Sequence, residues 1–190
     1  ASIIVMGCYV QGFEEEVKQI GGVKLLVGTK DRSKIKEYID NLDEQLSLVC
    51  DPKEFVEYEN LSISSSTENT RAFLKIQDGC NNFCSYCIIP YTRGPIRSKP
   101  STDVINEINK IVENGYKEVV LTGIHTGKYN DNGVDFTSLV KMILNETKLL
   151  RLRISSIELN EITDEFLNLL KTNKVVAEHL HLPLQAGSNH

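Results

Sequence analysis

The sequence predicts an α/β protein: part of an amino-terminal α/β domain with parallel strands, followed by half of a β/α barrel. Two observations predict this class. Short apolar runs, several of which end in glycine, alternate with stretches whose apolar residues recur at helical spacing. In the second part of the chain these strand–helix units repeat at roughly 25–30 residue intervals, which favours consecutive right-handed βαβ units.

The amino-terminal part predicts two strands and two helices in alternation. The apolar run 2–8 predicts a fully buried strand, and the run 23–28 predicts a second one. A short polar helix is expected over residues 13–20. Asp31 is expected to cap a further helix that runs to about Leu42, with apolar residues on one face. This order favours parallel pairing of the strands.

The polar stretch 57–70 predicts a linker, which divides the chain into residues 1–56, the linker and residues 71–190. Beyond the linker, strands are predicted at 71–76, 117–123, 149–154 and 175–182, with helices at 101–114, 136–147 and 163–170 and a polar loop at 127–135. The chain starts inside a predicted strand without a methionine and stops directly after another. It is therefore expected to be an internal fragment of a longer protein.

Three of the five cysteines lie in one loop, as Cys80, Cys84 and Cys87 with C-x3-C-x2-C spacing. The loop follows the predicted strand 71–76, and ligand-binding residues of α/β proteins collect where strands end. Cysteine thiolates hold iron–sulfur clusters. Three thiolates on a four-iron cluster leave one iron open, as catalytic zinc sites keep an open position. The spacing therefore predicts a [4Fe–4S] cluster with a reactive iron.

A zinc site and a disulfide also remain open for the three cysteines. A zinc site prefers paired C-x2-C units and needs a fourth ligand, and no partner pair is present. A disulfide is not suggested by three clustered thiols in a chain without a secretion signal. Cys50 matches no motif and is interpreted as an ordinary core or surface cysteine.

The motif Cys80-x3-Cys84-x2-Cys87, with Tyr86 just before the last cysteine, resembles that of the radical S-adenosylmethionine superfamily. The resemblance implies a radical-SAM partial (β/α) barrel over residues 71–190. It also implies a [4Fe–4S] cluster on the three cysteines and S-adenosylmethionine chelated by the open iron. Electron transfer would then cleave the sulfonium to a 5′-deoxyadenosyl radical.

Two longer strings resemble a family within that superfamily. Residues 73–80 and 93–99 are similar to the methylthiotransferases, closest to the branch acting on N6-threonylcarbamoyladenosine (t6A) in tRNA. Residues 5–11 resemble the end of that family's amino-terminal domain, where three cysteines hold a second [4Fe–4S] cluster. Cys8 matches the third of them, and the other two would precede Ala1. Without the resemblance, Cys8 is interpreted as a buried core thiol.

The next predicted strand end carries Thr122 and Gly123. The resemblance implies that their backbone meets the methionine amino group of the cosubstrate, although this chain lacks the acid of the family's Gly-Gly-Glu-like segment. His125 follows, as an acid–base group or as a loop histidine with an ordinary hydrogen bond. His179 and His181 share one face of the predicted last strand, but two histidines without a third ligand are a weak metal signal.

Further candidates follow the last two predicted strands. Serines after a strand bind ribose hydroxyls or carboxylates, or cap the next helix. The segment 179–188 resembles the family's fourth strand end, which lies near the cofactor. The cofactor-binding candidates here are Ser155, Ser156, Glu158 and Gln185. Arg93, Arg97 and Lys99 either offset the charge of the thiolates, meet phosphate or form a solvated basic loop.

Composition limits the other classes of function. The chain has 21 basic and 26 acidic residues, so its net charge of −5 gives no general attraction for nucleic acid. No run approaches the ~20 apolar residues of a membrane span, and no signal peptide opens the chain. Free cysteines with cluster spacing indicate a reducing cytoplasm.

The resemblance implies a tRNA methylthiotransferase that converts t6A, the adenosine 3′ of the anticodon, to its 2-methylthio derivative. Its expected partners are tRNA and a reductant such as flavodoxin or ferredoxin, with no membrane. As a fragment, the chain is expected to be inactive alone. The alternatives are isopentenyladenosine in tRNA or a ribosomal protein aspartate as the substrate. An electron carrier is the alternative from another class, but carriers fill the fourth iron with a further cysteine.

Overall fold

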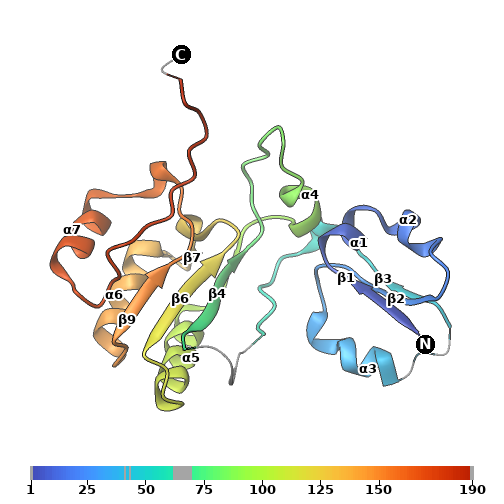
Figure 1. The fold of residues 1–190 in the computed structure, drawn as a ribbon, viewed down its shortest axis with the longest axis horizontal. Coiled ribbons are helices and arrows are strands. Elements are labelled where there is room, and N and C mark those ends of the chain that lie inside the picture. Colours follow the sequence, from blue (N-terminus) through green and yellow to red (C-terminus); the bar gives the residue numbers. More distant parts are fainter. Residues whose placement is uncertain (1, 41, 43, 62–69, 189–190) are drawn as a thin grey trace. The chain divides into compact units, whose positions relative to one another are not determined.

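The computed structural model describes residues 2–40, 42, 44–61 and 70–188. Contacts divide the chain into two compact units: unit 1 comprises residues 1–61 and 79–96, and unit 2 comprises residues 62–78 and 97–190 (Figure 1). Parallel strand pairs occur in both units, so the expected α/β class is confirmed.

The division into residues 1–56, a linker and residues 71–190 stays a prediction, because most of the expected linker, residues 62–69, lies outside the described residues. The contact-based units differ from that division in one respect. The loop 79–96, which carries the three cysteines, groups with unit 1. It does so because Thr92 and Arg93 at its far end bond to residues of the amino-terminal segment.

Unit 1 contains a three-stranded parallel sheet in the order β1–β2–β3. Its strands are β1 (Ile3–Met6), β2 (Val23–Val27) and β3 (Leu46–Leu48). The central strand β2 is almost wholly buried, but Ile3 and Met6 of β1 are 45% and 50% exposed. The expectation of a fully buried first strand is therefore wrong, because β1 is an edge strand with a neighbour on one side only.

Short helices surround this sheet: α1 (Cys8–Gly12), α2 (Glu14–Lys18), α3 (Ile35–Asp40), α4 (Ile89–Arg93), and 3₁₀ turns at Arg32–Lys34 and Pro52–Glu54. The expected cap at Asp31 is wrong. Asp31 has a left-handed backbone (φ 56°), and its side chain makes no capping hydrogen bond. A capping residue needs an extended backbone to direct its side chain at the first turn.

Unit 2 contains a four-stranded sheet in the order β5–β4–β6–β9. The strands β4 (Ala72–Asp78), β6 (Glu118–Gly123) and β9 (Arg151–Ile154) are parallel, as consecutive βαβ units require. The two-residue strand β5 (Arg97–Ser98) pairs antiparallel to β4 and was not predicted, since two residues show no periodicity.

Three helices complete unit 2: α5 (Ser101–Glu113), α6 (Phe136–Glu146) and α7 (Asp164–Thr172). In Figure 1, α5 and α6 lie behind the sheet. Side chains of one sheet face, such as Leu74, Leu121 and Ile154, form a buried core with these helices. Within the expected polar loop, β7 (Asn130–Asp131) and β8 (Val134–Asp135) form a small hairpin.

The predicted last strand, 175–182, is not a regular strand. It pairs with the segment around β9 only through isolated parallel bridges, Leu152 to Val176 and Ser156 to His181. Between the bridges the His179 N–H donates to the carbonyl of Ala177 within its own segment, at 2.7 Å. This local turn removes a donor from the ladder and interrupts the strand.

Among the described residues, no helix combines the length and the apolar character that crossing a membrane requires.

The amino-terminal end of α6 gives a first test of the fold. The Asp135 carboxylate accepts a hydrogen bond from the Ser138 N–H at 2.8 Å, and this bond lowers the pKa of the carboxyl. We expect Asp135→Ala to lower the free energy of unfolding by about 1 kcal/mol at neutral pH. The folded pKa lies below the unfolded value of about 4, so this stabilisation is present above about pH 4 and is lost as the pH falls through the folded pKa.

Urea unfolding at a series of pH values from neutral to acid checks this expectation. The control is Asp164→Ala in the first turn of α7, where Thr163 is the capping residue. An equal loss in the control would show that charge at a helix end, and not the capping bond, is responsible.

Candidate metal and cosubstrate site

The cysteine loop is closed at a narrow neck in unit 1. Gly79 has a left-handed backbone (φ 77°), and a Cβ atom there would lie 1.9 Å from the carbonyl oxygen of Pro95. The Cys80 N–H donates to the carbonyl of Gly94 at 3.1 Å. Only glycine fits position 79, because any side chain would meet backbone and not a flexible side chain.

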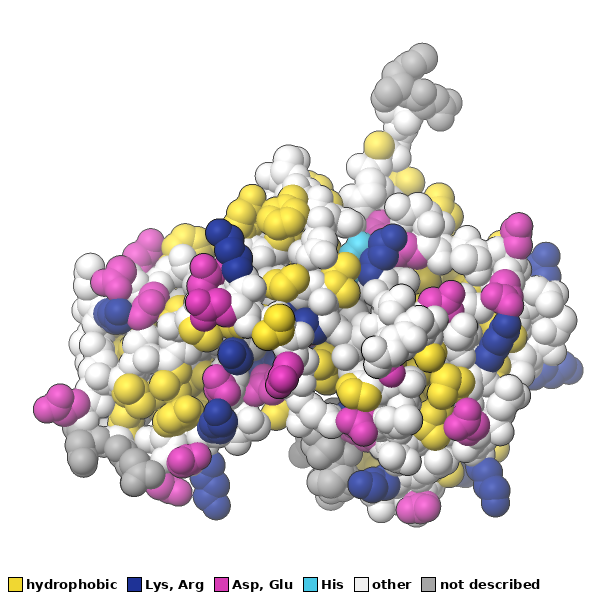
Figure 2. All heavy atoms as spheres, turned by 180° about the vertical axis from the view of Figure 1, so that it is seen from behind, with side chains coloured by type: hydrophobic (Ala, Val, Ile, Leu, Met, Phe, Trp, Pro, Cys, Tyr) yellow, Lys and Arg dark blue, Asp and Glu magenta, His cyan; other side chains and the backbone are white. Residues whose placement is uncertain are grey.

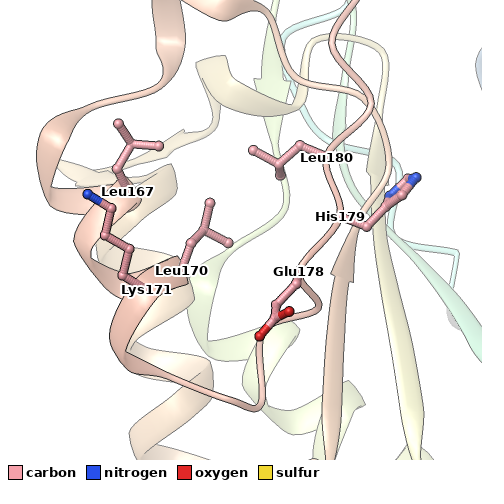
Figure 3. A pocket seen from close by; sticks show the side chains of 6 residues that line it. All are labelled: Leu167, Leu170, Lys171, Glu178, His179 and Leu180. Atoms are coloured by element: carbon pink, nitrogen blue, oxygen red, sulfur yellow. The ribbon is translucent and has the colours of Figure 1, made fainter.

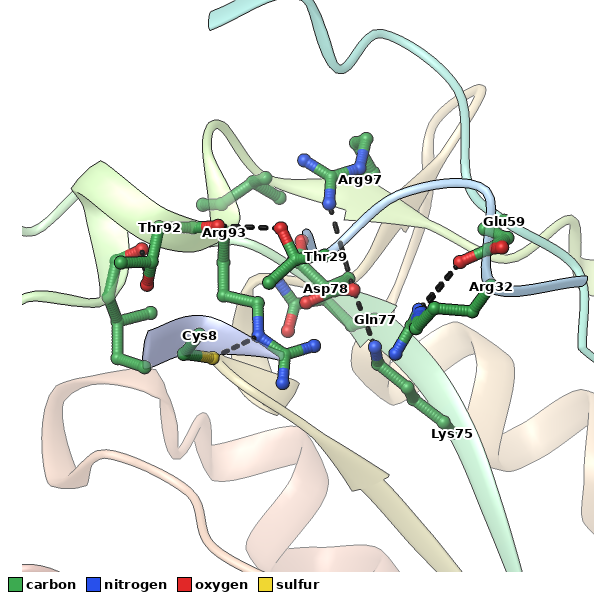
Figure 4. A network of polar contacts seen from close by, with 12 residues as sticks. Cys8, Thr29, Arg32, Glu59, Lys75, Gln77, Asp78, Thr92, Arg93 and Arg97 are labelled. Atoms are coloured by element: carbon green, nitrogen blue, oxygen red, sulfur yellow. Dashed lines mark hydrogen bonds and ion pairs between the residues drawn. The ribbon is translucent and has the colours of Figure 1, made fainter. Parts of the chain in front are cut away.

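In unit 2, ion pairs hold the residues that flank the cysteine loop. Asp78 and Arg97 are register partners in the β4–β5 ladder, and both are buried. The Asp78 carboxylate lies 2.5 Å from Lys75 Nζ and 3.7 Å from Arg97 Nη2 (Figure 4). Lys99 is also buried and is paired with Glu107. The interpretation of Arg97 and Lys99 as a solvated basic loop is therefore wrong, and carboxylates already balance both charges.

The three cysteines of the loop form no disulfide, and Cys80 Sγ accepts from the Asn82 N–H at 3.4 Å. Cys84 is exposed, and Cys80 and Cys87 are half-buried. The loop is held by its own backbone, since the Cys87 N–H donates to the carbonyl of Cys84 at 2.9 Å. Between the first two cysteines, Phe83 has a left-handed backbone (φ 47°), which is unfavourable for an aromatic residue and typical of functional loops.

The donor set fits a cluster better than a single ion. Among the described residues, no three His, Cys, Asp or Glu side chains are grouped so that they would hold one metal ion. Zinc needs all its sulfur ligands within about 2.3 Å of one centre. A [4Fe–4S] cluster instead takes its thiolates on different irons. Three cysteines within residues 80–87 suit the second arrangement, and their role as ligands stays a prediction.

Cys8 lies beside the far end of the cysteine loop. Arg93 Nε donates to Cys8 Sγ at 3.0 Å, and Figure 4 shows the Arg93 side chain directed at the sulfur. A Cβ on Gly12 would lie 3.4 Å from Thr92 Cγ2, so α1 and α4 are in close contact. Thr29 Oγ1 donates to the Thr92 carbonyl at 2.6 Å. Cys8 is half-buried, so the interpretation as a fully buried core thiol is wrong.

At the end of β6, Thr122 and Gly123 are half-buried, and Gly123 pairs with Gln77 of β4. His125 is buried (5% exposed) and forms an ion pair with Glu161 when the histidine is protonated. Sequence reasoning left the role of His125 open and assigned no role at the site to Gln77 or Glu161. The only available signal for Gln77 was its position directly after the predicted apolar strand 71–76.

At the end of β9 the structure brings several candidates together. Ser156 Oγ lies 2.7 Å from His181 Nδ1. Glu158 lies within hydrogen-bond range of Gln185, whose Nε2 is 3.4 Å from Glu158 Oε1. Ser155 is held by its backbone, since its N–H donates to the Leu121 carbonyl at 3.0 Å. The hydroxyl and carboxylate groups expected near the cosubstrate thus lie at the edge where β9 ends.

His179 takes no part in that group. It borders a cavity of about 470 Å³ lined by α7 and the following segment, at Leu167, Leu170, Lys171, Glu178, His179 and Leu180. Figure 3 shows Leu180 directed toward α7 and His179 directed to the opposite side. His181 is bonded to Ser156, so the two histidines of the predicted strand have different surroundings.

Charges of both signs are interspersed on the face seen in Figure 2, in agreement with the small net charge of −5. A single-sign surface field of the kind that attracts RNA over a distance is not seen on this face.

Known proteins were compared with the chain. The sequence profile described as "Radical SAM superfamily" matches residues 74–190. A Bacillus subtilis protein named threonylcarbamoyladenosine tRNA methylthiotransferase MtaB is 43% identical over 98% of this chain. A tRNA-2-methylthio-N(6)-dimethylallyladenosine synthase of Thermodesulfovibrio yellowstonii is 35% identical over 98% of the chain. A ribosomal protein uS12 methylthiotransferase RimO of Desulfotalea psychrophila is 34% identical over 96%.

In each case the match covers 43% of the other protein, so the chain spans less than half the length of these relatives. The resemblance to methylthiotransferases inferred from residues 73–80 and 93–99 is confirmed. So is the greater similarity to the threonylcarbamoyladenosine branch.

Proposed function

The chain belongs to the radical S-adenosylmethionine superfamily, and from this premise we propose that the protein is a tRNA methylthiotransferase acting on t6A. The product is the 2-methylthio derivative of that adenosine, which lies 3′ of the anticodon. The observation that carries the proposal is the loop of three cysteines with C-x3-C-x2-C spacing within a chain 43% identical to a relative with that name.

In this proposal Cys80, Cys84 and Cys87 hold a [4Fe–4S] cluster. When bound, the cluster and S-adenosylmethionine supply reductive radical chemistry. The protein contributes a fixed loop. Gly79 lets the two backbone strands of the neck approach each other, and Asp78 holds the residues that flank it. Exposure of Cys84 leaves the loop accessible to a cosubstrate.

The cosubstrate is assigned to the strand ends of unit 2. We assign the backbone of Thr122 and Gly123 to its methionine part. Ser155, Ser156, Glu158 and Gln185 supply hydroxyl, carboxylate and amide groups for its ribose and charged groups. The bonds from Ser156 to His181 and from Gln185 to Glu158 support this assignment, because they hold these polar groups at one edge.

Cys8 is proposed as one ligand of a second [4Fe–4S] cluster, the source of the inserted sulfur. The Arg93 Nε, which donates a hydrogen bond to its sulfur, would orient the Cys8 side chain. The proposed partners are tRNA and a reductant such as flavodoxin or ferredoxin. The proposed location is the cytoplasm, where thiols stay reduced. No RNA-binding surface is assigned to these 190 residues, given their net negative charge.

Two measurements test the proposal. The intact protein, reconstituted anaerobically, is expected to convert S-adenosylmethionine to 5′-deoxyadenosine when dithionite is added. Iron binding without that cleavage would favour an electron carrier. Mass spectrometry of tRNA and ribosomal protein from a deletion strain identifies the substrate. Loss of the methylthio group from t6A is the expected result. Loss from isopentenyladenosine or from a ribosomal protein aspartate would show one of the other two substrates.

A further inference from the structure

The candidate residues of unit 2 lie at the end of β6 and in the segments that follow β9, and the end of β6 pairs with the end of β4. Segments beyond strand ends are mobile unless side chains tie them together. In unit 2 three buried polar side chains cross between them: Gln77, His125 and Glu161. None of the three belongs to the proposed ligand set.

Gln77 joins the end of β4 to the loop after β6. Its side chain is fully buried. Its Nε2 donates to the carbonyl of Asp78 at 2.9 Å, and its Oε1 accepts from the His125 N–H at 2.6 Å. Asp78 directly precedes the cysteine loop, and His125 follows Thr122 and Gly123. One amide therefore joins the backbone at the end of β4 to the backbone that follows β6.

His125 and Glu161 join the loops after β6 and β9. The Glu161 side chain is 2% exposed and forms an ion pair with the His125 ring. Its second oxygen, Oε2, accepts from the Glu158 N–H at 3.3 Å. A Cβ on Gly127 would lie 2.2 Å from that oxygen, so the glycine leaves room for the carboxylate. The contacts thus run from Gln77 through His125 to the backbone of Glu158.

The polarity of these three residues needs a reason beyond packing. Burying an amide, an imidazole and a carboxylate costs free energy unless each group is bonded, and apolar residues of similar volume often serve stability equally well. Their bonds to the backbone reach Asp78 and His125, each two residues from a proposed ligand, and Glu158, which is itself a proposed ligand. Buried polar networks of this kind specify one geometry.

We infer that Gln77, His125 and Glu161 form a positioning relay that holds the end of β4 and the loops after β6 and β9 in register for S-adenosylmethionine. The inference rests on the proposed function for the identity of the cosubstrate. The mechanical coupling of the loops does not depend on it. The three side chains are positioning residues, since they act on the ligand through neighbouring backbone.

The first experiment uses the metal-free chain and measures amide hydrogen exchange. Glu161→Ala is expected to increase exchange at least about tenfold at residues 122–126 and 157–160, because it breaks both the ion pair and the bond to Glu158. Glu161→Gln keeps an oxygen acceptor and is expected to restore most of the protection. The control is Glu165→Gln in the exposed pair with Lys141, which should change neither segment.

The second experiment measures S-adenosylmethionine binding to the anaerobically reconstituted chain by equilibrium dialysis. Glu161→Ala should raise the dissociation constant at least about tenfold with unchanged iron content, and Glu161→Gln should stay within about threefold of wild type. Gln77→Leu fills a similar volume and removes both amide bonds. It should weaken binding similarly, which separates the effect from a cavity or a failure to fold.

The outcomes are distinct. Unchanged exchange at residues 122–126 in Glu161→Ala would overturn the relay. Increased exchange with unchanged affinity would overturn its role in cosubstrate positioning. Wild-type chain that loads iron but binds no S-adenosylmethionine would contradict the proposed function. The exchange data would still decide whether these segments are coupled.

Discussion

Cys84→Ala is expected to lower the iron bound by the reconstituted chain at least about tenfold. With Cys84 removed, two thiolates of the loop remain, and loss of even an outer-shell group costs a metal site about ten- to a hundredfold in affinity. Iron and sulfide are measured after anaerobic reconstitution and desalting. The wild-type chain should hold about four irons if it forms one cubane cluster.

The matched control is Cys50→Ala. Burial raises the pKa of the Cys50 thiol, so it stays protonated at neutral pH and is a poor metal ligand. The bond from Gln11 reaches the Cys50 carbonyl and survives the substitution. Iron content should therefore equal that of the wild type. Full iron loading of Cys84→Ala, or a loss in Cys50→Ala, would contradict the assignment of the cluster to the loop.

Gly79→Ala is expected to lower the free energy of unfolding by about 2–5 kcal/mol and to abolish cluster binding. About 1–2 kcal/mol comes from the left-handed backbone, and a further 1–3 kcal/mol comes from the collision of Cβ with the Pro95 carbonyl. Relief of the collision would open the neck between Cys80 and Gly94. Urea unfolding and iron content measure the two effects.

Gly115→Ala separates the two causes. Gly115 follows α5 with φ 90°, and a Cβ there would meet nothing within 4 Å. Gly115→Ala should lower the free energy of unfolding only by the roughly 1–2 kcal/mol that comes from the left-handed backbone. It should leave iron content unchanged. Equal losses of stability in the two variants would show that the neck is not tightly closed.

Sequence reasoning was accurate where the information is local. The helices α5, α6 and α7 begin and end close to their predicted residues, because capping residues and apolar spacing act within a few turns. It did not predict β3 or β5. These strands have only three and two residues, too few to show a periodicity, and they form because a longer strand lies beside them. It overestimated the burial of β1 because edge position depends on strand order.

The candidate site shows the same difference between local information and contacts of residues distant in sequence. The spacing of Cys80, Cys84 and Cys87 and the strings around them identified the family from local residues. His125 was visible in the sequence, but its partner Glu161 was not, because the two belong to different loops. Likewise, no local pattern connects Cys8 with Arg93, which are 85 residues apart.

The sequence by itself determined the α/β class, the order of the longer helices and strands, the loop of three thiols and the family. Each depends on periodicity or spacing along the chain. Only the tertiary structure decided which side chains meet: Arg93 at Cys8, Asp78 at Arg97, and Gln77, His125 and Glu161 between the loops of unit 2. These contacts join residues distant in sequence, and the parallel sheets bring their strand ends to a common edge.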